Sequence, residues 1–230
     1  MSGMSLTLIS AVMLAQTGAQ PAGGEKKEAA GGKVMATFIH AGDAGTVDVL
    51  VNGAPVAKSL AFGRTAPAND LAAGRAKIEF KAGDKVVLTK DATLAADKMY
   101  TIVAFGSKDK LEAQVIEAKA PAPGKAHAFF FHASPDAGNV DLNVDKKPVA
   151  KAFALGKTQE TTLDPGAHTI DVLAGSADPA LTTPLDAKAD TCYCVVIGGS
   201  TKGTPKLQAI IASHTMGKKA AMTPAPGGEK

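Results

Sequence analysis

Apolar and polar residues alternate with a period of two over many short stretches of this chain of 230 residues. The alternation is clear at 47–52, 76–81 and 168–172, and turn-forming pairs such as Asn52-Gly53 separate such stretches. Because successive side chains of a β-strand point to opposite faces, this pattern predicts half-buried strands joined by turns. No stretch carries the 3.6-residue periodicity of an amphipathic helix.

Two long segments of the chain repeat each other. The first, starting at Phe38, reads FIHAGDAGTVDVLVNGAPVAKSLAFG, and the second, starting at Phe130, reads FFHASPDAGNVDLNVDKKPVAKAFALG. Matching residues stay separated by about 92–96 positions, which indicates a duplicated domain and not a short solenoid repeat. We expect about six or seven strands in each copy. The sequence therefore predicts an all-β protein of two tandem immunoglobulin-like antiparallel β-sandwich domains.

The second copy carries a motif that extends beyond simple alternation. Residues 132–144 read HASPDAGNVDLNV, followed by a Leu-x-Pro-Gly turn and a Tyr-led apolar strand. This combination resembles the bacterial secreted family catalogued as domain of unknown function 4397. Residues 40–53 carry a shortened version, with Gly42 in place of Ser-Pro. The resemblance covers about 34–118 and 126–215, and it implies exported tandem sandwiches, often in envelope or surface proteins, with no established catalytic residues.

The two ends of the chain differ from the repeats. The apolar run LTLISAVMLA at 6–15 is too short to span a bilayer and, with small residues at 17–19, is typical of an export signal. We therefore expect a periplasmic, cell-surface or extracellular protein with no transmembrane span after signal removal. The predicted order is a signal peptide at 1–19, a disordered spacer at 20–33, domain 1 at 34–119, a Pro-rich linker at 120–125, domain 2 at 126–215 and a disordered tail at 216–230.

Composition and charge exclude some functions. The formal net charge is +3, but Lys and Arg equal Asp and Glu in number between 34 and 215, so the excess lies in the two ends. A neutral folded part lacks the clustered basic face that nucleic acid requires. Aromatic residues make up only 4%, without Trp, which is thin for stacking bases or sugars. No nucleophile elbow, phosphate-binding loop or zinc-protease motif occurs, and we expect a non-enzyme with no cofactor.

His40 and His132 occupy the same position in the two copies, each at the end of an apolar strand. Either could serve as a metal ligand or general base. The sequence favours a structural role instead, in which the ring hydrogen-bonds and fixes the loop that follows. The loops at 42–46 and 134–139 are then the candidate interaction loops, with Asp43, Asp136 and Asn139 as their polar residues. His214, near the C-terminal edge of the second copy, is expected to be exposed.

Asp48 and Asp141 alternate with core valines, so they are expected to face outward. With Asp43 or Asp136 their carboxylates could bind Ca²⁺, since oxygen ligands suit a hard cation. No EF-hand loop is present, and solvated positions on a strand face are the favoured interpretation.

Cys192 and Cys194 are the two cysteines of the chain, and they lie on one face of a predicted strand. Three hypotheses compete: inert half-buried thiols, a strained or interchain disulfide, and a soft-metal or redox site. His127 could share their face. The first copy has Met99 and Thr101 at these positions, so the fold itself does not require the thiols.

The function that fits these observations is a non-catalytic exported interaction module. It would bind envelope or matrix polysaccharide, or a protein, through the loops at one end of each sandwich, with two sites raising avidity. The alternatives are a metal-handling or redox protein that uses Cys192 and Cys194, a hydrolase without a recognisable site, and a purely structural spacer.

Overall fold

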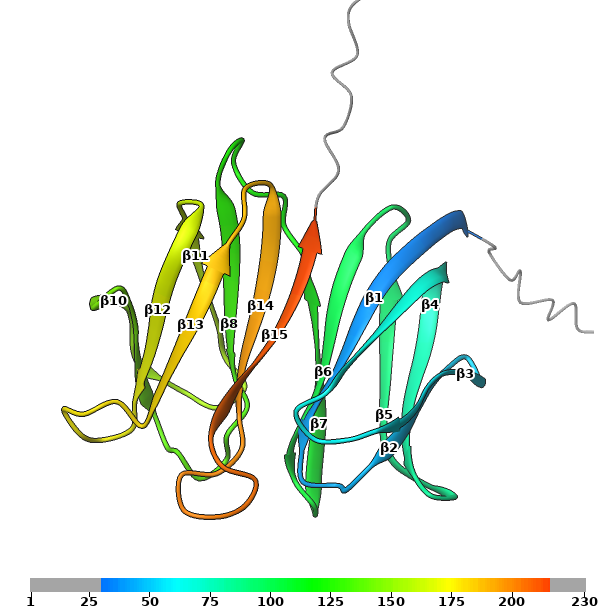
Figure 1. Cartoon of the computed structure of the whole chain (residues 1–230). Coiled ribbons are helices and arrows are strands. Elements are labelled where there is room, and N and C mark those ends of the chain that lie inside the picture. Colours follow the sequence, from blue (N-terminus) through cyan, green and yellow to red (C-terminus); the bar gives the residue numbers. More distant parts are fainter. Residues whose placement is uncertain (1–29, 216–230) are drawn as a thin grey trace, which may run out of the picture.

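The computed structural model describes residues 30–215, and within this range the chain forms fifteen β-strands and no helix (Figure 1). The first copy contains β1 (Ala30–Gly42), β2 (Val47–Val51), β3 (Ala54–Leu60), β4 (Thr65–Ala82), β5 (Lys85–Leu94), β6 (Met99–Ser107) and β7 (Lys110–Glu117). The second contains β8 (Ala126–His132), β9 (Val140–Val144), β10 (Lys147–Phe153), β11 (Thr158–Leu163), β12 (Gly166–Leu173), β13 (Leu181–Ala187), β14 (Thr191–Gly198) and β15 (Gln208–Thr215). The predicted all-β class is confirmed. No helix in 30–215 could cross a membrane.

The second copy is a sandwich of two four-stranded sheets. One sheet has the order β10-β9-β12-β13 and the other β11-β8-β14-β15. All neighbouring strands are antiparallel except β8 and β14, which run parallel. Alternate side chains of both sheets fill the space between them, and Phe130, Leu142 and Val195 are fully buried there. The alternation in the sequence is thus the alternation between core and outer faces.

The first copy has the same layers, but one strand belongs to both. Residues 65–73 of β4 pair with β1, whereas residues 74–82 pair with β5 and partly with β2. The second copy divides this strand into β11 and β12 at Pro165, which has no N–H to donate to a ladder. The first copy has Ala73 at that position, so its strand continues from one layer into the other.

A tyrosine fixes the same corner in each copy. The Tyr100 hydroxyl accepts a hydrogen bond from the backbone N–H of Ala95 at 3.0 Å, and the Tyr193 hydroxyl accepts one from Lys188 at 3.0 Å. Each Tyr thereby ties the loop before its strand to the sandwich, as in immunoglobulin-like folds.

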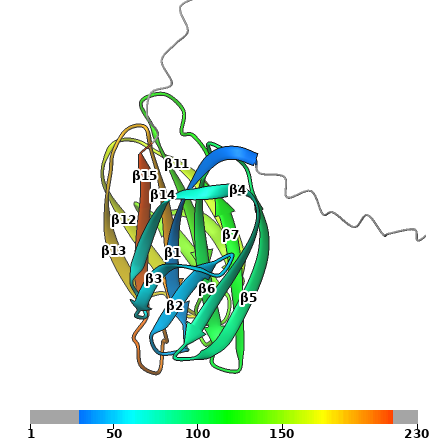
Figure 2. The same cartoon turned by 90° about the vertical axis from the view of Figure 1, so that its right-hand side faces the viewer.

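The two sandwiches pack directly against each other. The sheet that contains β1, β6 and β7 faces the sheet that contains β8, β14 and β15, and in Figure 2 the second sandwich lies behind the first. The shared cluster consists of Ile39, Ala41, Val103, Phe105, Ile116, Phe129, Phe131, Ala133, Cys192, Cys194, Val196, Ile210 and Ala212. We call this cluster the interdomain core. It means that apolar packing, and not only the linker, fixes how the copies lie relative to each other.

The spacer and the linker expected from the sequence are both more ordered than predicted at the ends that adjoin the sandwiches. The strand β1 begins at Ala30, so residues 30–33 of the predicted spacer belong to the sheet. Their backbone pairs with β4, and this pairing does not require apolar side chains. The linker at 120–125 is fastened to the second copy, because Gly124 N–H donates to the Asp190 carboxylate and Asp190 N–H donates to the Lys125 carbonyl. The predicted signal peptide, the rest of the spacer and the tail lie outside the described residues.

Candidate functional site

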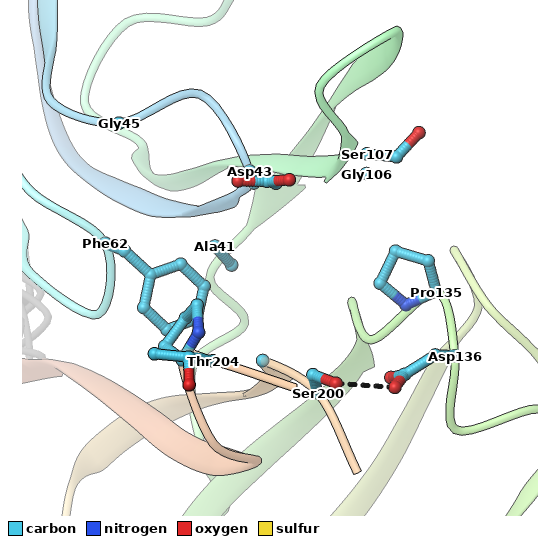
Figure 3. A pocket seen from close by; sticks show the side chains of 13 residues that line it. Ala41, Asp43, Gly45, Phe62, Gly106, Ser107, Pro135, Asp136, Ser200 and Thr204 are labelled. Carbon is cyan, nitrogen blue, oxygen red and sulfur yellow. Dashed lines mark hydrogen bonds between the residues drawn. The ribbon is translucent and has the colours of Figure 1, made fainter. Parts of the chain in front are cut away.

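Loops from both copies meet at one end of the interdomain core and line an open pocket of about 370 Å³ (Figure 3). The first copy contributes the β1–β2 loop, the β3–β4 loop and the end of β6. The second contributes the β8–β9 and β14–β15 loops. The lining residues are Ala41, Gly42, Asp43, Gly45, Phe62, Gly106, Ser107, Pro135, Asp136, Gly199, Ser200, Thr204 and Pro205. Both candidate loops from the sequence therefore border one pocket.

His40 and His132 each form a hydrogen bond to the pocket loop that follows in the sequence. Nε2 of His40 donates to the Gly45 carbonyl at 2.7 Å, and Nε2 of His132 donates to the Gly138 carbonyl at 2.7 Å. Burial lowers the pKa of both rings, and the loop carbonyl opposes this shift only in part. A neutral ring with a proton on Nε2 matches a carbonyl acceptor. Each histidine thus fixes the conformation of the loop that follows it.

His40 and His132 differ in the environment of the second ring nitrogen, Nδ1. Nδ1 of His132 accepts the backbone N–H of Ser134 at 3.3 Å. Nδ1 of His40 is buried without a hydrogen-bond partner among the described residues. The first loop is one residue shorter and has Gly42 where the second has Ser-Pro, so no N–H is placed to cap the ring. His40 therefore carries a buried acceptor without a hydrogen bond, whereas the corresponding acceptor of His132 is bonded.

Asp136 anchors the β14–β15 loop across the pocket rim. Its carboxylate accepts hydrogen bonds from Ser200 Oγ at 2.6 Å and from Thr201 N–H at 3.2 Å. Partial burial would raise the pKa of this carboxyl, but the bonds from Ser200, Thr201, Ser134 and Lys202 outweigh burial and lower it to about 2. The side chain is thus a fixed negative charge that also shapes the loop.

Asp43 lies at the corresponding place in the first copy but is held differently. Its backbone N–H donates to the Gly106 carbonyl at 3.0 Å. Within residues 30–215 its carboxylate has neither a hydrogen bond nor an ion pair. Asn139 is exposed on the same loop as Asp136 and is not among the lining residues. Of the three candidate polar residues, Asp43 and Asp136 line the same pocket from different copies, and Asn139 lies outside it.

Asp48 and Asp141 lie away from the pocket and perform a local task. The Asp48 carboxylate accepts the backbone N–H of Ser59 at 2.7 Å, and the Asp141 carboxylate accepts that of Ala152 at 2.8 Å. Ser59 and Ala152 both have φ of 50°, which marks an irregular turn of the neighbouring edge strand. These carboxylates cap edge-strand irregularities and do not join Asp43 or Asp136 in a calcium site.

Cys192 and Cys194 are free thiols buried in the interdomain core. Burial is the main cause that raises the pKa of Cys192 to about 11 and that of Cys194 to about 12. Metals and redox partners react with the thiolate, and burial disfavours that form. Among residues 30–215 no three His, Cys, Asp or Glu side chains are grouped so as to hold a metal ion. The arrangement therefore gives the soft-metal hypothesis no support.

The surroundings of the two thiols correct one expectation. His214 is buried, with 8% of its surface exposed, and its Nε2 lies 3.1 Å from Thr101 Oγ1 of the first copy. The prediction of an exposed His214 is wrong, because the first sandwich covers this edge. His127 does lie beside Cys192 in the sheet, but its Nε2 contacts the Glu160 carboxylate at 3.2 Å.

Several pocket residues were not singled out by sequence reasoning. They are Phe62, Ser107, Ser200 and Thr204. A usable signal was the repeated Gly-Ser at 106–107 and 199–200, which ends the central strand of each copy. Gly106 and Gly199 have φ of 107° and 98°, and a Cβ there would collide with the carbonyl of Lys110 or Lys206. These glycines allow the tight exits that place the serines at the rim.

The fold and the pocket define a tandem β-sandwich protein whose copies share one loop-end pocket. The family described as "Domain of unknown function (DUF4397)" matches the chain twice, at residues 34–143 and 126–221. The chain belongs to this family; the first match covers the first copy and continues into β9, and the second match covers the second copy. No protein with a curated description matches it.

Proposed function

We propose that the protein is an exported, non-catalytic interaction module that binds its partner in the pocket between the two copies. The observation that carries this proposal is the convergence of Asp43 and Asp136, one from each copy, on the same pocket. Loops at the end of a rigid sandwich are the usual place for recognition in such folds. Envelope or matrix material is the proposed source of the partner, on the strength of the export signal expected at 1–19.

The geometry favours one composite site over two independent ones. Two separate sites would need loops that reach solvent at different places, whereas here the copies are locked together by the interdomain core. Duplication then supplies the two walls of a single pocket, in place of two separate sites that would act through avidity. A partner would contact both copies at once.

The chemistry of the pocket supports binding in preference to catalysis. Ser200 Oγ donates to the Asp136 carboxylate, and His40 and His132 both donate from Nε2 to backbone carbonyls. A serine nucleophile requires a base that accepts its proton and is itself oriented by a third group. Asp136 accepts the Ser200 hydrogen bond, but its pKa of about 2 makes it a weak base, and the hydrogen bonds at this rim instead fix the shapes of the loops.

A pocket-filling substitution provides the test. Purified residues 20–230 would be sedimented with isolated envelope and matrix fractions of the host, alongside Pro135→Trp, which fills the pocket from an exposed lining position. Val86→Trp, on the exposed start of β5, is the matched control. We expect saturable binding that Pro135→Trp weakens by roughly tenfold or more and that Val86→Trp leaves unchanged. Equal binding by both variants would refute the pocket as the site.

A further inference from the structure

The charge of the pocket is one-sided. Asp43 and Asp136 line it from opposite copies, and no Lys, Arg or His is among the lining residues. Figure 3 shows Asp43 and Phe62 on the side of the first copy, and Pro135 and Asp136 on the side of the second. Elsewhere in the described chain many exposed carboxylates pair with a lysine, as Glu117 does with Lys98 at 2.8 Å. The Asp43 carboxylate has no such partner within 30–215, so a cationic ligand would meet a free anion.

The remaining walls of the pocket are apolar or uncharged. Phe62 contributes the aromatic ring, and Ala41, Pro135 and Pro205 contribute aliphatic surface. A ring face attracts a cation, and aliphatic walls suit a methylene stem. The hydroxyls of Ser107 and Thr204 can accept hydrogen bonds from a donor-rich group. This combination is complementary to a positive group on an apolar stem.

The same combination already holds a lysine inside this protein. Lys119 Nζ lies 5.5 Å from the centre of the Phe129 ring and 2.6 Å from the Glu160 carboxylate. That site uses one ring and one carboxylate, whereas the pocket offers one ring and two carboxylates. The protein therefore already contains one lysine that is bound by an aromatic ring and a carboxylate between the two copies.

We propose that the pocket binds the guanidinium or ammonium group of an Arg or Lys side chain presented by a partner protein. This inference rests on the proposed function and names its ligand chemistry. Acidic or phosphorylated ligands would be repelled by the two carboxylates. A neutral sugar would find a single aromatic ring and no cation among the lining residues. A basic side chain is complementary to both kinds of wall, because its stem can pack on the apolar surface while Asp43 and Asp136 attract its charged head.

The test uses small probes that differ in charge and little else. Isotope-labelled protein, residues 20–230, would be titrated with N-acetyl-arginine methylamide and with its citrulline counterpart, a neutral isostere, while backbone amide shifts are followed by NMR. We expect saturable shifts at Gly45, Ser107 and Ser200 with the arginine probe and binding roughly tenfold weaker with the citrulline probe. Equal binding of the two probes would overturn the inference.

Two variants separate the charge from the shape of the pocket. Asp43→Asn should weaken the arginine probe by roughly threefold to tenfold, because it removes a free carboxylate that ties no loop. Asp109→Asn is the matched control, since Asp109 is exposed in the adjacent β6–β7 turn and does not line the pocket. An equal loss in both variants would show long-range attraction without a site and would contradict the proposal.

Two further outcomes keep this inference distinguishable from the proposed function. If Pro135→Trp abolishes binding to the host fractions but the arginine and citrulline probes bind equally, the pocket is the site and its cationic ligand is refuted. If glucosamine binds more tightly than the arginine probe and N-acetylglucosamine does not, the cation belongs to an amino sugar, and the protein partner is refuted.

Discussion

The ring of Phe105 in the first copy meets the ring of Phe131 in the second edge to face, with centroids 4.9 Å apart and planes at 82°. Both side chains are buried, and both belong to the interdomain core. Edge-to-face pairs of this kind contribute about 0.5–1.5 kcal/mol beyond the burial of their area. The contact joins sandwiches that are each complete in their layers, so it ties the folding of one copy to the other.

Removing one ring should therefore destabilise both copies together. We expect Phe131→Ala to lower the free energy of unfolding by about 3–5 kcal/mol, because it leaves a cavity in a packed interface. Denaturant unfolding followed by circular dichroism should show one transition for the unsubstituted protein. Leu155→Ala is the control, since Leu155 is 43% exposed. A Phe131→Ala loss no larger than the control would mean that the interface does not hold the copies.

The sequence predicted the strands and the repeat but not this interface, for a physical reason. Alternation identifies a strand with one buried face, whereas residues 191–198 are buried throughout. Such a doubly buried strand reads as a nearly continuous apolar run, and residues 126–132 have the same character. The run shows that something covers the outer face and does not identify the cover. The shared pocket could not be foreseen, because it exists only where the two copies meet.

The loops were more accessible to sequence reasoning, because their hydrogen bonds are local. His40 and His132 bond to carbonyls only a few residues ahead, and a strand end followed by a Gly/Asp-rich loop predicts such a bond. The bonds from Ser200 and Thr201 to Asp136 join residues more than sixty positions apart. No local pattern encodes that distance. The sequence therefore located both loops, and the fold determined what faces them.

The edge-strand caps give a second prediction. Asp48→Ala should lower the free energy of unfolding by about 1 kcal/mol, because it leaves the Ser59 N–H without its acceptor at a residue with positive φ. Asp48→Asn keeps an acceptor oxygen and should retain most of the stability. Thermal and denaturant unfolding of the two variants would measure this difference. An Asp48→Ala variant as stable as the unsubstituted protein would show that the cap contributes nothing.

Stability should fall on mild acidification. Burial lowers the pKa of His40, His132 and His214 below the ordinary value of 6.5. The unfolded chain then takes up protons at a higher pH than the folded one, so protonation favours unfolding. The contribution of these three groups is complete above about pH 6.5 and is lost as the pH falls from there toward their folded pKa values. Denaturant unfolding between about pH 8 and pH 5 would measure the loss.

His168 opposes this trend and provides the control. Hydrogen bonds to the Asp164 carbonyl and the Asp145 carboxylate raise its pKa above 6.5. Its stabilising contribution is complete below 6.5 and is lost as the pH rises through its folded pKa. His168→Gln removes this opposing contribution. The free energy of unfolding of the variant should therefore fall more steeply on acidification than that of the unsubstituted protein. A His168→Gln variant that is equally stable at both ends of the range would contradict the assignment of three buried neutral histidines, because no opposing histidine would then mask their loss.

The buried thiols should be almost inert until the two copies separate. With pKa values of about 11 and 12, against an ordinary 9.0, Cys192 and Cys194 would carry about a hundredfold and a thousandfold less thiolate at pH 8. Burial against the first copy blocks reagent as well. Iodoacetamide labelling followed by mass spectrometry should therefore modify both only in denaturant, and Phe131→Ala should speed labelling, because it weakens the interface that covers them. Rapid labelling of the native protein would show that the copies open readily and would restore the thiols as a candidate reactive site, whereas labelling that follows global unfolding would identify them as part of the interdomain core alone.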